Sequence, residues 1–567
     1  MTIKSPAWNL IQKILVIGLV MCAIGLPRYL GQGSYVTSDE NFWLYRSANF
    51  LQALSKADFA NTFQKGHPGV TVTWVGAVSF LITYPAYIQD NPGQVNESRI
   101  LLHFVERAGR EPLQLLQASR KVAVLANIFV LVLAYLATIT LVGLYPASIG
   151  FLFIAFDPYA IALSRLLHPD SFLGPIMLLA LVAMANYFYR GRRPFHLALS
   201  AVATGFGWLT KSPAFFLIPF FGLLSILEIR NIGLESLRRG GKGWGKLLKP
   251  GLVWFGIAAL IFVAFWPSMW VNPLGTLKNV FGQAVTYAEE GHDKALFFAG
   301  KVYDSGNIWD LSFYPVNYLW RSSLPVLIGL GLAGLAFVFR RKLEFPREVR
   351  WTIVTLALFA VLFTAFLSFG GKKFDRYLIP IFAPLDLVAG LGWWVIVRNV
   401  FRSEVFREYS RLGSKWLPKL AGTAMILGVI LAQFANVLRA RASYLSYYNP
   451  ALGGITKASD VMMIGWGEGL DQAADYLNSK PNPGRLIALT WYPQIFSYNF
   501  IGKTRQKDFP ANPSELEKVD YYVVYVNQWQ RDFPSPEFIH FLDGFTPEYV
   551  VRINGADYVR IYHDLVK

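Results

Sequence analysis

Long apolar runs recur along the first 437 residues of this chain, separated by short polar or basic stretches. A run of about 20 apolar residues can cross the roughly 30 Å hydrocarbon core of a bilayer as an α-helix. The pattern predicts helices at 11–26, 69–90, 119–142, 146–167, 171–189, 196–212, 213–229, 251–271, 322–339, 351–369, 377–397 and 419–437. We therefore expect a polytopic α-helical membrane protein with about 11–12 membrane segments.

The pattern changes after residue 437. The sequence Trp466-Gly467-Glu468-Gly469 leads into a helical pattern that ends near Leu477. Strand-like runs follow at 486–490, 521–526, 549–553 and 558–562. Glycine and proline separate these runs, as is typical of turns. We expect a transmembrane domain over 1–437 and a small C-terminal α/β domain over 438–567.

The composition agrees with a membrane protein. Hydrophobic residues make up 54% of the chain and charged residues only 16%, whereas soluble proteins carry about 25% charged residues. The net charge of +17 comes from short clusters between apolar runs, so we expect no nucleic-acid partner. The single cysteine, Cys22, excludes an intrachain disulfide and a cysteine-based metal site.

The basic clusters predict the orientation of the helices, because basic loops are retained on the cytoplasmic side of a membrane. The clusters lie at 99–121, 190–193, 230–249, 340–342 and 398–419. Each crossing of the membrane moves the chain to the other side. All five clusters can therefore be cytoplasmic only if one apolar segment does not cross the membrane. We expect that segment to be 146–167, broken or re-entrant at Asp157-Pro158, because proline removes a helix hydrogen bond.

This orientation predicts which stretches face the outside of the cell. They are the loops 28–68, 272–321 and 370–376, the turns at 167–171 and at Lys211, and everything from about 440 onward. Polar residues suited to catalysis gather in these stretches. We therefore expect a multi-pass protein of the cell (plasma or inner) membrane with its site on the extracytoplasmic face.

Asp39 and Glu40 are the first candidates for catalytic residues. They follow Thr37 and precede an aromatic, amphipathic stretch over 41–54. A structural explanation is available, since Thr37 and Glu40 have the spacing of a capping box and Asp39 would complement the helix dipole. The alternative is a carboxylate that acts as a base where the membrane meets water.

Several cations at the predicted outer face could bind a phosphate. They are Arg165, Lys211, Lys372, Lys373 and Arg376. A charge in or next to a membrane segment is costly and is usually paired or functional. Binding to lipid headgroups is the alternative explanation for the 372–376 group.

Three further polar residues could orient a substrate. His67 stands at the entrance of the second apolar run, and His168 and Asp170 stand at the start of the fifth. His168 and Asp170 could equally begin a helix or bind a metal, although no metal-ligand spacing supports the latter. The acidic stretch 289–293, in a loop rich in tyrosine, tryptophan and asparagine, is a second candidate for the acidic centre.

The order of these motifs resembles that of a known superfamily. Asp39-Glu40 is followed by His67-Pro68-Gly69, then by Ser164-Arg165 and Asp170, then by Lys211 between two later runs. This order is similar to that of the protein O-mannosyltransferase and aminoarabinose-transferase superfamily, the GT-C integral-membrane glycosyltransferases. The chain departs from the mannosyltransferases in having His-Pro-Gly where they usually show His-Pro-Pro.

The resemblance implies a polyprenyl-phosphate sugar donor, metal-independent transfer and an acidic residue of the Asp-Glu pair as base. It implies no cofactor, and a glycan, lipid or protein as acceptor. We expect a membrane glycosyltransferase that moves a monosaccharide from the lipid donor to an acceptor on the extracytoplasmic face. A transporter or flippase of lipid-linked saccharide is the alternative, although such proteins tend to show paired, matched broken helices.

Overall fold

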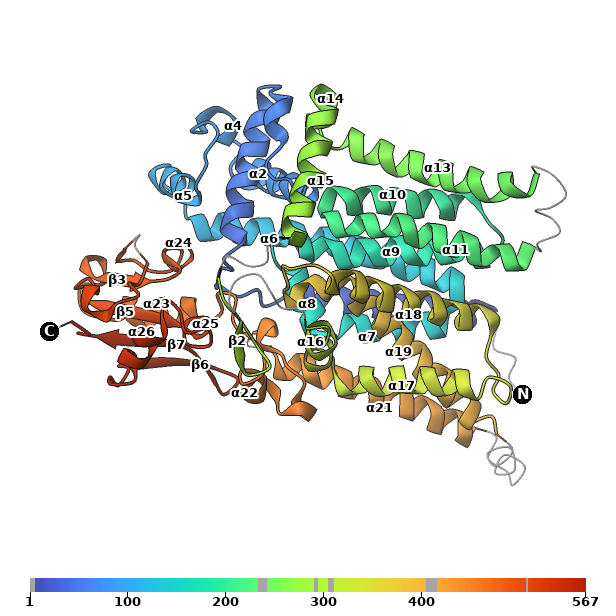
Figure 1. The fold of residues 1–567 in the computed structure, drawn as a ribbon. Helices are drawn as coiled ribbons and strands as arrows, with labels where there is room; N and C mark the ends of the chain where they lie inside the picture. The colour runs from blue at the N-terminus through green and yellow to red at the C-terminus, as the bar shows by residue number, and fades with distance from the viewer. Residues whose placement is uncertain are drawn as a thin grey trace.

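The computed structural model describes residues 6–232, 242–289, 294–303, 310–403, 416–441, 443–505 and 508–566. Within these ranges a helical bundle is followed by a small sheet at one end of the bundle (Figure 1). All twelve apolar runs contain helix. The predicted fold class, a polytopic α-helical protein with a C-terminal α/β part, is confirmed.

Six helices with long apolar stretches form the body of the bundle. They are α1 (Pro6–Tyr29), α6 (Pro112–Val142), α9 (Pro169–Tyr189), α18 (Arg347–Ser368), α19 (Ile379–Val400) and α21 (Leu417–Arg439). Helices with shorter apolar stretches complete it: α3 (Val70–Thr83), α10 (Pro194–Thr210), α11 (Leu217–Ile232), α13 (Lys242–Ala264) and α17 (Leu324–Val338). By length and composition, six spans among the described residues could cross a membrane, or up to eight if each bent helix pair is one span. The protein is a multi-pass membrane protein.

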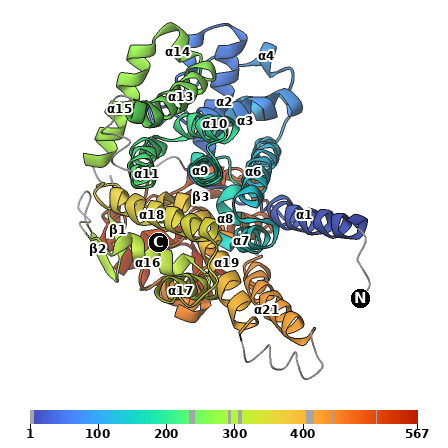
Figure 2. The ribbon, with the colours of Figure 1, turned by 90° about the vertical axis from the view of Figure 1, so that its right-hand side faces the viewer.

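Helix α9 lies at the centre of the bundle. Seen end-on, it is surrounded by other helices (Figure 2), and it contacts α6, α10, α18 and α19. Its hydrophobic window is buried along its whole length. Because α9 is apolar on every side, it has no face that needs water or lipid. The first turn of α9 is therefore held in a fixed position, and that turn carries His168 and Asp170.

The predicted break at Asp157-Pro158 is present. Helix α7 (Leu144–Ala155) and helix α8 (Pro158–Ser164) meet at 70°. Asp157 caps α8 by accepting a hydrogen bond from the Ala160 N–H at 2.6 Å. The guanidinium of Arg28, which is buried, donates to the carbonyls of Ile154 and Ala155 at 3.0 and 3.3 Å. These bonds satisfy carbonyls freed by the break, as burial inside a membrane protein requires.

The broken segment nevertheless runs the length of the bundle, so the expectation that it fails to cross is wrong. The start of α6 is fixed by Arg120, whose Nε donates to Glu40 at 2.7 Å. From Arg120 to Val142, α6 rises by about 33 Å. The chain then returns through α7 and α8 until the Leu167 N–H donates to the same Glu40 carboxylate at 3.0 Å. Residues 144–167 therefore connect opposite ends of the bundle.

The segment that fails to cross is α3. Its 14 residues span about 21 Å, which is less than the bilayer core. The helix ends before Tyr84-Pro85, because a proline disfavours helical backbone at the residue before it. Ser119 of α6 donates to Ser79 of α3 at 3.1 Å, which keeps α3 at the Glu40 end. The basic cluster 99–121 therefore lies at that end too, opposite to the clusters 190–193 and 340–342 with which the sequence grouped it.

The C-terminal part is built on a five-stranded sheet. Its strands are β3 (Ile487–Thr490), β4 (Lys503–Thr504), β5 (Tyr521–Tyr525), β6 (Tyr549–Ile553) and β7 (Ala556–His563), in the order β4-β3-β5-β7-β6. β3 is parallel to β4 and β5, whereas β7 is antiparallel to β5 and β6. Helices α22 (Gly454–Ala458), α23 (Leu470–Asn478), α24 (Pro493–Phe496), α25 (Val526–Trp529) and α26 (Pro536–Leu542) accompany the sheet. The four strands expected from the sequence are confirmed.

The remaining short elements lie at the same end as the sheet. They are α2 (Glu40–Ser55), α4 (Tyr87–Asp90), α5 (Ser98–Arg107), α14 (Ser268–Val271), α15 (Pro273–Glu289), α16 (Phe313–Arg321), β1 (Leu296–Phe298) and β2 (Lys301–Tyr303). One face of the sheet shares a continuous apolar core with the bundle, through residues such as Tyr525 and Val559. Helix α1 begins at the opposite end (Figure 1).

Gly69 is the position where the chain departs from His-Pro-Pro. Its φ is +66°, a left-handed conformation that proline cannot adopt. A Cβ atom there would lie 2.0 Å from the ring of Trp43. Glycine is thus required both by the backbone and by the close approach of Trp43, which packs edge-on against His67 at 5.6 Å between ring centroids.

Single-cysteine labelling tests which segment fails to cross. In a Cys22→Ser background, we expect an impermeant maleimide to label Lys457→Cys at the sheet end in intact cells. Arg341→Cys, in a basic loop at the opposite end, should react only after permeabilisation. Arg99→Cys decides whether α3 or the segment 146–167 fails to cross the membrane. We expect it to react in intact cells, as Lys457→Cys does. Labelling of Arg99→Cys only after permeabilisation would contradict the position assigned to α3.

Candidate active site

Five charged or titratable side chains from four segments meet at the sheet end of the bundle. Asp39 precedes α2, His168 and Asp170 begin α9, Lys211 follows α10, and Arg376 lies in the 3₁₀ turn η3 (Asp375–Leu378). The predicted outer stretches supply all of them. The sequence predicts that all five lie at one face of the membrane, and in the structure their side chains are in contact.

Asp39 is held by two of these groups. Its Oδ2 lies 3.2 Å from Nη2 of Arg376 and 3.5 Å from Nε2 of His168. His168 Nδ1 accepts the backbone N–H of Asp170 at 3.2 Å. Nδ1 therefore carries no hydrogen, and the Nε2–H of the imidazole faces Asp39. Asp39 keeps 30% of its side chain exposed, so a substrate can reach its carboxylate.

Asp170 is held by Lys211 and, like Asp39, by Arg376. Its Oδ1 accepts a hydrogen bond from Nζ of Lys211 at 2.6 Å, and its Oδ2 lies 3.6 Å from Nε of Arg376. The side chain of Asp170 is fully buried. Lys211 Nζ also lies 4.2 Å from the centroid of the Tyr377 ring. A buried carboxylate needs such partners, because an unpaired charge away from water is strongly destabilising.

Its partners determine the ionisation of Asp39. Burial alone would raise the pKa of the Asp39 carboxyl, but the hydrogen bond from His168 and the charge of Arg376 lower it below its usual value. Asp39 is therefore ionised at neutral pH. Its favourable contacts are lost only as the pH falls through this lowered pKa, below the value of about 3.9 expected in the unfolded chain.

A cavity of about 550 Å³ opens on one side of Asp39. Its polar lining includes His67, His168 and five cations: Arg46, Lys65, Lys211, Lys372 and Arg376. Among the residues that the structure describes, Asp39 is the one carboxylate in this lining. Aromatic and apolar side chains form the rest, among them Phe42, Trp43, Tyr287, Phe366, Phe369 and Tyr377. This cavity is positively charged and largely apolar, and we call it the cationic cavity.

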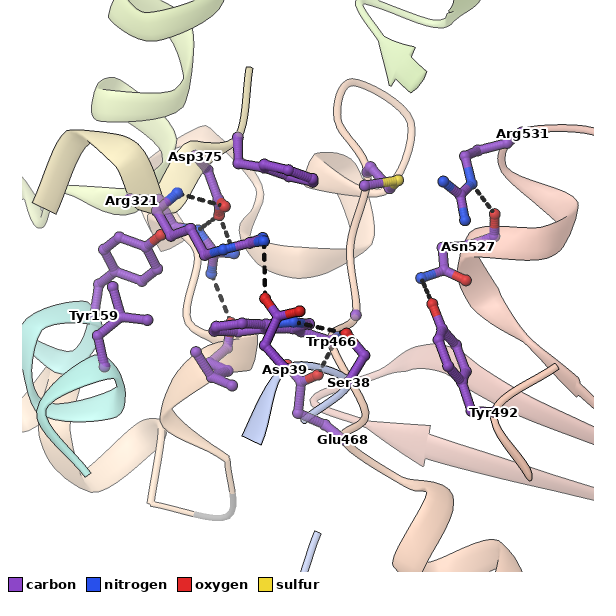
Figure 3. A pocket seen from close by; sticks show the side chains of 16 residues that line it. Ser38, Asp39, Tyr159, Arg321, Asp375, Trp466, Glu468, Tyr492, Asn527 and Arg531 are labelled. Atoms are coloured by element: carbon purple, nitrogen blue, oxygen red, sulfur yellow. Dashed lines mark hydrogen bonds and ion pairs between the residues drawn. The ribbon is translucent and has the colours of Figure 1, made fainter. Parts of the chain in front are cut away.

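A second cavity of about 210 Å³ lies on the other side of Asp39, between the bundle and the sheet (Figure 3). Asp39, Phe374 and Arg376 line both cavities. The bundle side contributes Ser38, Tyr159, Arg321 and Asp375, and the C-terminal part contributes Trp466, Glu468, Tyr492, Asn527 and Arg531, among others. We call this the sheet cavity. Asp39 thus lies between the cationic cavity, which is largely apolar, and the sheet cavity, which is lined by both acidic and basic side chains.

Glu40 and Arg165, both predicted site residues, do not reach either cavity. The Glu40 carboxylate has no exposed surface and is paired with Arg120. It also accepts from the Thr37 N–H at 3.1 Å, which is one of the two bonds of the predicted capping box. The residue before α2 is Asp39 and not Thr37, so the other bond of the box is not formed. Arg165 donates to the carbonyls of Pro27, Leu30 and Gly31, so it caps the C-terminal end of α1. Both residues hold the loop after α1 in place.

The other predicted residues divide between the cationic cavity and its surroundings. Lys372 lines the cavity, with its Nζ 4.7 Å from the Tyr287 ring centroid. Lys373 lies outside the lining, with its Nζ 3.5 Å from the carbonyl of Asp310. Burial, together with the nearby charge of Lys211, holds the pKa of His67 well below its usual value, so this imidazole is neutral. Glu290, His292 and Asp293 lie outside the described residues.

Sequence reasoning missed Arg46, Lys65 and most of the sheet cavity. Arg46 lies within an amphipathic helix, where a basic residue is ordinary, and its guanidinium stacks 4.9 Å from the Trp43 ring centroid. The aromatic stretch 41–54 was the available signal for it. Tyr492, Asn527 and Arg531 carried no local signal, since only the packing of the sheet on the bundle brings them near Asp39.

Comparisons with known proteins agree with the resemblance that the motif order indicated. Residues 116–272 match the family model for Dolichyl-phosphate-mannose-protein mannosyltransferase. No curated protein sequence matches the chain. Among solved structures, the S. cerevisiae protein O-mannosyltransferase Pmt1-Pmt2 complex bound to the sugar donor has a TM-score of 0.51 and 10% identity, over 76% of this chain and 89% of that chain. The chain has the GT-C fold.

Two further structures are similar over nearly the whole chain. ArnT from Cupriavidus metallidurans bound to undecaprenyl phosphate has a TM-score of 0.47 and 13% identity, over 98% of both chains. The oligosaccharyltransferase AglB from Archaeoglobus fulgidus has a TM-score of 0.47 and 12% identity, over 97% of this chain and 74% of that chain. The resemblance to the GT-C superfamily inferred from the motifs is confirmed by the family match and the shared fold.

The buried ion pair of Asp170 and Lys211 is open to a stability test. We expect Lys211→Met to destabilise the protein by about 3–5 kcal/mol, because it leaves Asp170 buried with only the more distant Arg376. The double variant Lys211→Met/Asp170→Asn should recover part of the loss. Lys480→Met breaks an exposed pair with Glu548 and should cost no more than about 1 kcal/mol. Thermal unfolding in detergent that ranks the double variant below Lys211→Met would contradict this account.

Proposed function

We propose that the protein transfers a monosaccharide from a polyprenyl-phosphate donor to the hydroxyl of an acceptor on the extracytoplasmic face of the membrane. The observation that carries the proposal is the arrangement at Asp39, where a cationic, apolar cavity meets a second, polar cavity at an accessible carboxylate. The shared GT-C fold and the mannosyltransferase family match support the same reaction class.

The cationic cavity suits a lipid phosphate. Arg46, Lys65 and Lys372 have no carboxylate of the described residues within ion-pair distance, so their charges are available to an anionic ligand. Phosphate oxygens form strong, charge-assisted hydrogen bonds with such groups. At the end of α18, Phe366 and Phe369 line the cavity and are 48% and 72% exposed. An isoprenoid chain could therefore enter between apolar side chains that face the lipid.

The chemistry follows from the positions of the charges. The acceptor oxygen forms a bond to C1 of the donor sugar while the bond between C1 and the phosphate oxygen breaks. The lipid phosphate leaves with the electron pair, and the cations of the cavity stabilise its additional charge. Asp39 accepts the proton of the acceptor hydroxyl, and the Nε2–H of His168 orients the Asp39 carboxylate. A weakly basic carboxylate is sufficient, since the hydroxyl becomes acidic as its bond to C1 forms.

The basic loops support an extracytoplasmic site. Clusters 190–193, 340–342 and 398–402 follow α9, α17 and α19 and lie at the end of the bundle opposite to Asp39, where α1 begins (Figure 1). Basic loops are usually cytoplasmic, which leaves the Asp39 end outside. A transporter or flippase is less well supported, because both cavities lie at one end of the bundle, whereas a transporter site lies near the midplane between repeats.

The role of Asp39 as the base is tested by Asp39→Asn. The amide keeps the shape of the side chain but cannot accept the proton, so we expect sugar transfer to fall by roughly 10²-fold or more. Binding of polyprenyl phosphate should be retained, because the cations remain. Asp58→Asn, in the loop that follows α2 and outside both cavities, is the matched control. Near-normal transfer by Asp39→Asn from a radiolabelled donor would refute the assignment.

The donor site is tested by a neighbouring pair of lysines. Lys372→Met should weaken the binding of polyprenyl phosphate to the purified protein by about tenfold or more, because it removes a charged partner from the phosphate. Lys373→Met is the control, since Lys373 lies outside the cavity lining and we expect little change. Thermal unfolding would show that both variants are folded. Equal lipid affinities for the two variants would exclude the proposed position of the phosphate.

A further inference from the structure

Two polar residues of the sheet cavity lie just beyond the carboxyl ends of parallel strands in the C-terminal part. Tyr492 stands two residues after the end of β3, and Asn527 stands two residues after the end of β5. These two strands are parallel neighbours, so their carboxyl ends reach the same edge of the sheet. Ligands of open α/β sheets bind outside the carboxyl ends of parallel strands. That edge faces Asp39 across the sheet cavity (Figure 3).

The polar groups on this wall are already oriented. Asn527 Nδ2 donates to the Tyr492 hydroxyl at 2.9 Å. Arg531 donates from Nε to the Asn527 carbonyl at 2.9 Å, and its guanidinium stacks 4.6 Å from the Trp491 ring centroid. On the opposite wall, Trp466 Nε1 donates to Ser38 Oγ at 3.0 Å, next to Asp39. A ligand between these walls would meet planar polar groups and aromatic rings without rearranging them.

The charges of the sheet cavity cancel. Three cations, Arg321, Arg376 and Arg531, face three carboxylates, Asp39, Asp375 and Glu468. Arg321 is paired with Asp375 at 2.7 Å, and Arg376 with Asp39 at 3.2 Å. Among the described residues, the cationic cavity has, by contrast, five cations and one carboxylate. A negatively charged ligand therefore gains from the cationic cavity and gains little from the sheet cavity.

We propose that the sheet cavity binds the acceptor, and that the acceptor is a neutral carbohydrate, the terminal sugar of a glycan, with one hydroxyl beside Asp39. This inference rests on the proposed glycosyl transfer. Aromatic rings pack against the apolar faces of a sugar, and the amide, phenol and guanidinium groups bond its hydroxyls. A peptide acceptor is less well supported, because neither edge strand of the sheet, β4 or β6, contributes to the lining.

Saturation-transfer NMR on the purified full-length protein tests the acceptor class. The probes are uncharged methyl glycosides of mannose, glucose and N-acetylglucosamine, and a serine-containing octapeptide. We expect at least one glycoside to bind and the octapeptide not to bind. Tyr492→Phe and Asn527→Ala should each weaken glycoside binding by about 3- to 10-fold, the effect of losing one hydrogen bond. Tyr492→Phe is conservative enough to fold if Asn527→Ala does not.

Tyr549→Phe is the matched control, since Tyr549 lies on edge strand β6, stacks on Tyr476 and does not line the cavity. It should leave glycoside binding unchanged. Binding of the octapeptide alone, or equal glycoside binding by Tyr492→Phe and Tyr549→Phe, would overturn the carbohydrate assignment. Polyprenyl-phosphate binding measured on the same samples separates the two proposals. Its absence from the wild-type protein would overturn the proposed function, whereas lipid binding without glycoside binding would overturn only this inference.

Discussion

The Asp170 carboxylate has no exposed surface, and it is stable there only because Lys211 and Arg376 supply opposite charge. Removing one partner from a buried ion pair is costly, so the three segments that carry these groups are tied together. They are the first turn of α9, the end of α10 and the η3 turn. Helix α9 is buried at the centre of the bundle. The charged cluster is therefore held in a fixed position, because Asp170 lies in the first turn of α9. The geometry at Asp39 depends on that position through Arg376 and His168.

Arg376 connects the structural and chemical roles of the cluster. It lies within ion-pair distance of both Asp39 and Asp170, and it stacks on Phe374 with its Cζ 3.9 Å from the ring centroid. Arg376 and Phe374 also line both cavities. Arg376, which pairs with both carboxylates, therefore forms the partition between the cavities together with Phe374. A donor phosphate in one cavity and an acceptor in the other would meet at the gap in that partition, which Asp39 occupies.

The C-terminal part contributes to the site because it is packed rigidly on the bundle. Its sheet shares the apolar core of the helices, and the loop before α23 passes close to the backbone of Val36. A Cβ atom on Gly467 would lie 2.1 Å from the Val36 carbonyl, and the φ of Gly467 is +117°. Glycine at this position lets Trp466 reach the charged cluster and Glu468 reach the sheet cavity. The sequence Trp466-Gly467-Glu468-Gly469 thus serves the site as well as starting a helix.

The sequence by itself determined the helical runs, the break at Asp157-Pro158 and the strands of the sheet, because these depend on local hydrophobicity, on proline and on β-propensity. It also grouped the polar stretches that meet at the sheet end of the bundle. It selected Asp39 and Lys211 through motif order, and Arg376 as a cation at the predicted outer face. Only the tertiary structure decided that Glu40 and Arg165 hold the loop after α1, that α3 fails to cross, and that Arg46 and Asn527 face the cavities. These outcomes depend on which distant groups satisfy each buried charge and carbonyl. The paired groups, such as Glu40 and Arg120, are far apart in the chain. Only the packing of the folded chain brings them together, so the local sequence does not reveal the pairs.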